Sequence, residues 1–151
     1  MKKTNLFLLF IIFCLIFIYS CSSSDNKHYT EKTLSHHWFL RVLNDKQVLK
    51  EKAGKQIPYL DLNMYENSVT GNTGCNDITG KVDLEDHNIT FRNMSMTKMN
   101  CSDAEYEQDF ISYIFNGTLK INIDTPSTLL FYKDDKAVMI FVIENNQPEE
   151  K

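Results

Sequence analysis

The stretch Tyr59-Leu60-Asp61-Leu62-Asn63-Met64-Tyr65 alternates between apolar and polar side chains. Its leucines and methionine fall on one face of an extended chain, whereas its aspartate and asparagine fall on the other, because successive side chains of a strand point to opposite sides. This pattern predicts a half-buried β-strand and sets the fold class for the rest of the chain.

Segments with the same two-residue period lie on both sides of this stretch. They are rich in β-branched and aromatic residues, and turn pairs such as Asn44-Asp45 and Glu66-Asn67 separate them. With residues 59–65 they make about eight short strands, the others being residues 36–43, 68–73, 80–84, 89–91, 119–123, 129–131 and 137–143. The charged connection at residues 133–136 is typical of an exposed hairpin loop.

One segment departs from this period and predicts a helix. Residues 102–105 have the capping-box form Ser-x-x-Glu, and apolar side chains then recur at helical spacing until Asn116-Gly117. We therefore expect a single helix over about residues 103–116. The predicted fold class is α+β and mostly β: an antiparallel sheet of about eight short strands curled into an open barrel, with the helix covering one end or edge.

The size and charge of the chain limit the number of domains and the classes of partner that it can have. Its 151 residues fit one domain. Apart from Lys2 and Lys3, the chain has 14 basic and 20 acidic side chains, so residues 21–151 carry a net charge of about −6. An acidic body without a basic stripe is a poor match for phosphate backbones. We expect no nucleic-acid partner, no cofactor and a monomer.

The amino terminus predicts export and lipid attachment. A basic start is followed by 14 consecutive apolar residues, Leu6 through Tyr19, a run that is short for a membrane span and typical of a signal peptide. Ile18-Tyr19-Ser20-Cys21 resembles the bacterial lipobox, in which Cys21 would become the first residue and carry diacylglycerol and palmitate-like chains. The alternative is an ordinary secretory signal in which Cys21 is incidental.

These features divide the chain into four parts. Residues 1–20 are the predicted lipoprotein signal peptide, 21–33 a lipidated flexible tether, 34–145 the folded domain and 146–151 a polar tail. Ser22 after the lipidated cysteine resembles the outer-membrane address of enteric-type bacteria. We therefore expect a protein of the bacterial cell envelope, anchored in the outer membrane with its domain facing the periplasm.

Two cysteines remain for the folded domain. Cys14 leaves with the signal peptide and Cys21 is acylated, so Cys75 and Cys101 are left. Outside the cytoplasm two such thiols usually form a disulfide. The alternative is a pair of reduced, buried thiols, of which Cys75 could act as a nucleophile with His87 as its base.

Three methionines close to Cys101 suggest a second kind of site. Met94, Met96 and Met99 supply soft thioether ligands, which favour copper(I). Copper(I) is a metal that occurs in bacterial envelopes. The alternative is that Met94 and Met96 share one face of a strand and fill the core as adaptable apolar side chains. Metal ligation by the three methionines is therefore a hypothesis beside a simple packing role.

Two blocks of the sequence carry a family resemblance. The first is Gly74-Cys75-Asn76-Asp77-Ile78-Thr79-Gly80 and the second is Thr97-Lys98-Met99-Asn100-Cys101, followed by the predicted helix. Their order and spacing resemble the META/HslJ family of bacterial envelope proteins, which show Gly-Cys-Asn-x-x-x-Gly and then Thr-x-Met-x-Cys. The residues that match are Gly74, Cys75, Asn76, Gly80, Thr97, Met99 and Cys101.

The resemblance implies a small β-rich fold with one helix and a link to heat shock or stress. It supplies no established catalytic residue. We therefore expect a non-enzymatic envelope lipoprotein that acts in a stress response or in resistance to toxic compounds, through binding or envelope stabilisation. Its partners would be the membrane, through the lipid, and an unidentified protein or small molecule. The alternative function is binding or handling of copper(I) in the envelope.

Overall fold

A computed structural model describes residues 31–115 and 117–143 of the chain. The predicted signal peptide, Cys21, most of the predicted tether and the polar tail at 146–151 lie outside the described residues. Across the described part, no helix has the length and apolar character needed to cross a membrane.

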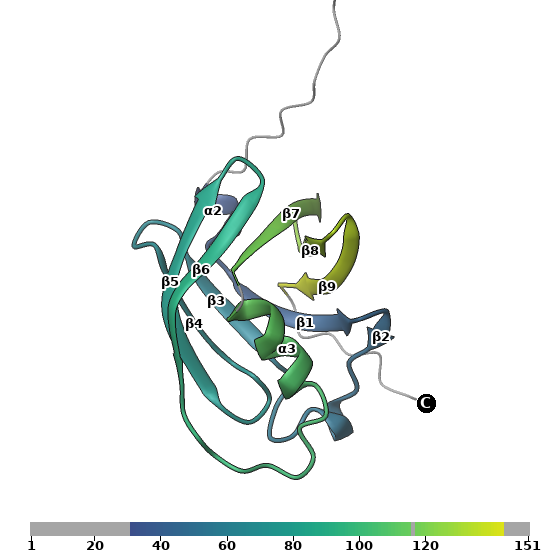
Figure 1. The fold of residues 1–151 in the computed structure, drawn as a ribbon. Coiled ribbons are helices and arrows are strands. Elements are labelled where there is room, and N and C mark those ends of the chain that lie inside the picture. Colours follow the sequence, from purple (N-terminus) through teal and green to yellow (C-terminus); the bar gives the residue numbers. More distant parts are fainter. Residues whose placement is uncertain (1–30, 116, 144–151) are drawn as a thin grey trace, which may run out of the picture.

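Short strands make up most of the domain, and one helix of two turns accompanies them (Figure 1). In chain order the elements are α2 (Glu31–Leu34), β1 (His37–Leu43), β2 (Lys46–Gln47), the 3-10 helix η1 (Lys50–Lys52), β3 (Tyr59–Asn63), β4 (Ser68–Asn72), β5 (Asp77–Glu85), β6 (Asn88–Met96), α3 (Glu107–Ile114), β7 (Thr118–Thr125), β8 (Thr128–Lys133) and β9 (Lys136–Val142).

The strands form one antiparallel sheet that closes into a ring. Their order is β2-β1-β3-β4-β5-β6-β7-β8-β9, and β1 also pairs with β9, with Leu40 opposite Phe141. The ring is an uneven barrel, because β7 pairs with β6 only through residues 88–90. The predicted fold class is confirmed. The ninth strand is β2, whose two exposed residues lack the alternation that identifies a strand in the sequence.

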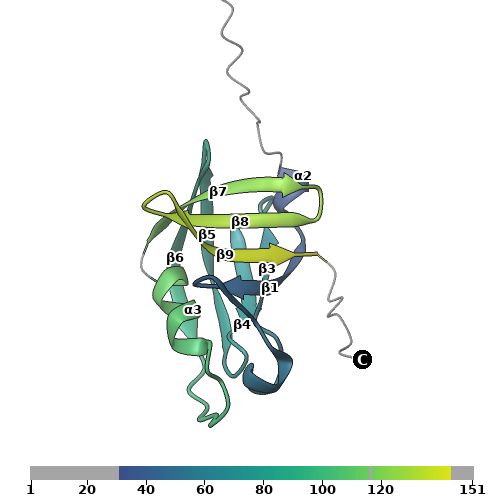
Figure 2. The ribbon, with the colours of Figure 1, turned by 90° about the vertical axis from the view of Figure 1, so that its right-hand side faces the viewer.

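The inner face of the ring carries the core. Leu60, Leu62 and Met64 are buried as the alternation predicts. Phe141 of β9 lies between two other aromatic rings, with centroid distances of 5.2 Å to Phe131 and 6.2 Å to Phe110 of α3. Phe110 and Ile114 of α3 are fully buried, and the Tyr113 hydroxyl donates to Asn44 in the β1–β2 turn, so the helix covers one edge of the ring (Figure 2). The expected covering role of the helix is therefore confirmed.

The extent of that helix differs from the prediction. We expected a helix over about 103–116 with a capping box at 102–105, whereas α3 begins at Glu107 and ends at Ile114. Ala104 instead forms an isolated antiparallel bridge with Ala53, and the Glu105 amide donates to the Lys52 carbonyl at 3.1 Å. These backbone contacts hold the segment in turns, so its local helix signal is overridden.

A four-residue helix, α2, precedes β1. Residues 31–33, which the sequence assigns to the tether, belong to α2. The Ser35 amide and hydroxyl both donate to the Glu31 carbonyl, and Trp38 Nε1 donates to the Leu34 carbonyl at 2.8 Å. Because Leu34 and Trp38 are both fully buried, α2 is fixed to the start of β1.

The core packing leads to a first prediction. Phe141→Ala removes a fully buried ring between Phe110 and Phe131 and should lower the free energy of unfolding by about 3–5 kcal/mol, through lost burial and the cavity left behind. Urea denaturation followed by circular dichroism measures the change. Tyr65→Ala is the control, since Tyr65 is 64% exposed and should change stability by less than about 0.5 kcal/mol. Equal effects of the two substitutions would contradict the described core.

Candidate functional site

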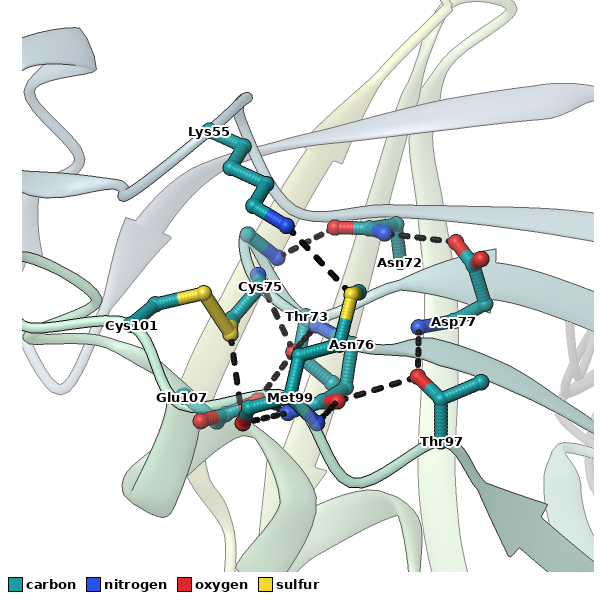
Figure 3. Close-up of a disulfide and its surroundings, with 11 residues drawn as sticks. Lys55, Asn72, Thr73, Cys75, Asn76, Asp77, Thr97, Met99, Cys101 and Glu107 are labelled. Atoms are coloured by element: carbon teal, nitrogen blue, oxygen red, sulfur yellow. Dashed lines mark hydrogen bonds between the residues drawn. A yellow bond between two sulfur atoms is a disulfide. The ribbon is translucent and has the colours of Figure 1, made fainter.

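The two family blocks meet at one end of the sheet. Residues 73–76 connect β4 to β5, and residues 97–101 follow β6. Figure 3 shows the side chains of both segments gathered around Asn76 and the disulfide. Six of the seven predicted motif residues are brought together there, namely Gly74, Cys75, Asn76, Thr97, Met99 and Cys101. The seventh, Gly80, lies farther along β5.

Cys75 and Cys101 are bonded to each other. Their Cα atoms are 5.9 Å apart, and the bond joins positions 26 residues apart in the chain. Cys75 is fully buried. A sulfur in this bond carries no thiolate, so the alternative of Cys75 as a nucleophile with His87 does not hold in this structure.

The side chain of Asn76 is the centre of a buried hydrogen-bond network, which we call the Asn76 node. Its Oδ1 accepts from the Met99 amide at 2.6 Å and from Thr97 Oγ1 at 2.9 Å. Its Nδ2 donates to Glu107 Oε1 at 2.8 Å and to the Met99 carbonyl at 3.3 Å. Asn76 is only 3% exposed, and both ends of its amide are satisfied. The node therefore fastens the segment after β6, and the start of α3, to the β4–β5 connection.

Thr73 extends the node on its other side. The hydroxyl donates to Glu107 Oε1 and accepts from the amides of Cys75 and Asn76, at 3.3 and 2.9 Å. The carboxylate of Glu107 thus receives hydrogen bonds from both Thr73 and Asn76 at the first residue of α3. The family motif names neither Thr73 nor Glu107. A threonine directly before Gly-Cys-Asn is a recognisable turn signal, whereas nothing in the sequence singles out Glu107.

Two glycines of the motif are required by close backbone approach. Gly74 has φ +98°, and a Cβ there would lie 2.1 Å from the Ala53 carbonyl oxygen. A Cβ on Gly80 would lie 2.2 Å from Met94 Sδ and 2.9 Å from the Arg92 carbonyl oxygen. Gly74 therefore lets the β4–β5 connection lie against residue 53, and Gly80 lets β6 approach β5 closely.

The three methionines occupy different surroundings. Met94 and Met96 are partly buried and pack against the core. Met99 is 40% exposed, and its sulfur lies 3.3 Å from Lys55 Nζ, whose positive charge would oppose a copper(I) ion at that sulfur. This arrangement favours packing roles for Met94 and Met96 over joint copper(I) ligation. Among the described residues, no group of three or more His, Cys, Asp or Glu could hold a metal ion.

Comparisons with known proteins place these features in a wider context. The family model described as META domain matches residues 32–146. The chain is 28% identical over 89 residues to heat shock protein HslJ of Escherichia coli strain K12. That alignment covers 58% of this chain, and it spans 60% of the length of the curated relative.

Two solved structures share the fold. One, an NMR structure, superposes with a TM-score of 0.60 at 21% identity, over 76% of this chain and 95% of its own length. The other, an NMR structure of a protein from Burkholderia xenovorans, gives a TM-score of 0.56 at 20% identity, over 77% of this chain and 87% of its own. At these identities the likeness shows the fold alone.

The Asn76 node makes a testable claim about stability. Asn76→Ala should lower the free energy of unfolding by about 2–3 kcal/mol, because it leaves the Met99 amide and other buried polar groups without partners. Chemical denaturation measures the loss. Asn100→Ala removes the same type of side chain from an exposed position in the loop after β6 and should stay within about 0.5 kcal/mol. Comparable losses of stability in the two variants would show that the hydrogen bonds of the Asn76 node do not stabilise the domain more than an exposed asparagine does.

The disulfide makes a separate claim. The double variant Cys75→Ala/Cys101→Ala should be less stable than the oxidised protein by roughly 3–4 kcal/mol, since the bond closes a loop of 26 residues in the unfolded chain. Dithiothreitol should lower the stability of the wild type and leave that of the double variant unchanged. A wild type that does not respond to complete reduction would contradict this account.

Proposed function

Because this chain belongs to the META domain family, we propose that it is a non-enzymatic, lipid-anchored protein of the bacterial cell envelope. It acts in a heat-shock-related response, or in resistance to toxic compounds, by binding a partner or by stabilising the envelope. The observation that carries the proposal is that the polar side chains of the family motif are used to hold the domain together.

The non-enzymatic part of the proposal follows from that observation. A catalytic amide or hydroxyl must turn a donor or acceptor toward a substrate. Asn76 instead directs both ends of its amide at neighbouring residues, and Thr73 is fully buried with its hydroxyl shared among Cys75, Asn76 and Glu107. The motif is therefore best explained as a fold-forming element on which a binding surface is built.

The envelope part rests on the amino-terminal sequence and on the disulfide. The apolar run Leu6 through Tyr19 and the lipobox-like end at Cys21 are typical of an exported lipoprotein. A Cys75–Cys101 disulfide fits an oxidising compartment such as the periplasm. Ser22 after Cys21 favours the outer membrane, and the acyl chains would hold the domain to that surface from its periplasmic side.

The stress-response part rests on the relative. The protein from Escherichia coli carries the name heat shock protein HslJ, and the alignment with it spans 60% of its length. We extend that role to this chain because the META domain match covers residues 32–146.

Lipid attachment is tested by metabolic labelling. Cells that produce the full chain are grown with radiolabelled palmitate, and the protein is then isolated and counted. The wild type and Cys14→Ser should both incorporate label, because Cys14 lies inside the signal peptide, whereas Cys21→Ser should incorporate none. Label that persists in Cys21→Ser would remove the proposed anchor.

The same variants test the proposed role in heat-shock or toxic-compound resistance. In a strain that lacks the gene, the wild type and Cys14→Ser should restore survival after heat shock or exposure to a toxic compound, and Cys21→Ser should not. Full restoration by Cys21→Ser would show that the role does not depend on the lipid.

A further inference from the structure

Three aromatic rings cluster on the outer face of β1 and β3. His37 stacks against Tyr59 at a centroid distance of 4.4 Å, with 27° between the ring planes. Phe39 lies edge-on to His37 at 4.4 Å and is paired in register with Tyr59. All three side chains are half-buried, since they point away from the core and remain partly open to solvent. We call this group the ring cluster.

Two carboxylates flank the ring cluster. Asp61 is the next outward position after Tyr59 on β3, and its Oδ1 lies 2.5 Å from Nδ1 of His37. Asp77 lies two strands away in the same row, because Tyr59 pairs with Asn72 and Asn72 pairs with Asp77. At the usual strand spacing this separation is about 9–10 Å. The outer face therefore presents aromatic rings between two negative charges.

Asn72, between Tyr59 and Asp77 in the row, donates its Nδ2 to Asp77 Oδ1 at 2.7 Å, and the second oxygen of Asp77 can accept from a ligand. The polar atoms of His37 and Asp61 also offer acceptors. When the imidazole of His37 is neutral, its Nδ1–H donates to Asp61 and Nε2 is left as an acceptor. Burial raises the pKa of the Tyr59 phenol, and the negative charges of Asp61 and Asp77 raise it further. Both carboxylates therefore act at the Tyr59 hydroxyl. A matching ligand must bring hydrogen-bond donors and positive charge.

An open groove continues the face beyond Asp77. It has a volume of about 290 Å³, and Asp77, Ile78, Thr79, Ser95, Met96 and Thr97 line it. Thr79 and Ser95 are directly opposite each other on β5 and β6. The surface that ligands would meet is thus a broad sheet face with a shallow extension. Small-molecule sites are usually deep and enclosed, so this shape favours a polypeptide.

We propose that this outer face binds arginine or lysine side chains of a partner polypeptide. Guanidinium and ammonium groups stack on aromatic rings and pair with carboxylates, and both kinds of group are present here. In an extended segment, side chains two residues apart lie on the same side at about 6.5–7 Å, a spacing that brings two basic groups onto one face. Asp61 with the ring cluster would take one basic side chain, and Asp77 the other.

This inference deepens the binding role proposed above and depends on the domain alone. Lipid attachment at Cys21 and recognition of basic side chains involve different residues. Palmitate labelling can therefore succeed while peptide binding fails, and the two proposals can be judged separately.

The probe is a fluorescein-labelled pentapeptide with two arginines separated by one alanine. Its anisotropy is followed during titration with the full chain in a non-ionic detergent. The matched ligand control replaces both arginines by citrulline, which keeps the shape and removes the charge. Saturable binding of the arginine peptide, at least about tenfold tighter than that of the citrulline peptide and weakened by salt, is expected. Equal binding of the two peptides, or no saturation at millimolar protein, overturns the proposal.

Variants locate the site. Asp61→Asn and Tyr59→Leu should each weaken binding of the arginine peptide by about fivefold or more. The first substitution removes a negative charge, and the second removes an aromatic ring face. The controls are Tyr65→Leu and Glu66→Gln, an exposed tyrosine and carboxylate in the β3–β4 turn, which should leave binding unchanged. Circular dichroism checks that each variant is folded.

Two results would assign the face differently. If the control variants weaken binding of the arginine peptide as much as Asp61→Asn and Tyr59→Leu do, binding reflects the overall negative charge of the protein. The assignment of the site to the ring cluster would then be wrong. If spermidine binds as tightly as the peptide and shows the same loss in Asp61→Asn, the occupant is a small amine and the polypeptide proposal is overturned.

Discussion

The side-chain amide of Asn76 is the interaction on which the rest of the domain depends. It joins three segments that are far apart in the sequence: the β4–β5 connection that carries it, the loop at Thr97 and Met99, and the start of α3 at Glu107. Because the amide is buried, each of these bonds would be costly to leave unmade. The Cys75–Cys101 disulfide holds the same two loops covalently, so the node and the bond reinforce each other.

Much of this arrangement could be predicted from the sequence. The alternation in residues 59–65 identifies β3 and its buried face. Counting the cysteines outside the predicted signal peptide and lipid attachment site pairs Cys75 with Cys101. The Gly-Cys-Asn block is also interpretable, because glycine at position 74 indicates a backbone conformation that other residues rarely adopt. These features depend on local pattern or on composition, which a single sequence contains.

The parts that sequence could not supply depend on contacts between distant residues. The helix begins at Glu107 because Ala104 and Glu105 bond to the backbone at residues 52 and 53, and the capping-box pattern contains no information about that contact. Glu107 looks like any acidic residue at a helix start until Thr73 and Asn76 are seen to donate to it. The pairing of His37 with Asp61 likewise requires the register of β1 against β3.

Hydrogen exchange tests the central claim most directly. The amides of Gly74, Asn76 and Met99 donate to side chains of the node and its neighbours. They should exchange as slowly as amides in the middle of β3 and β4, although they lie outside the strands. Exchange as fast as in the exposed β8–β9 turn would contradict the account.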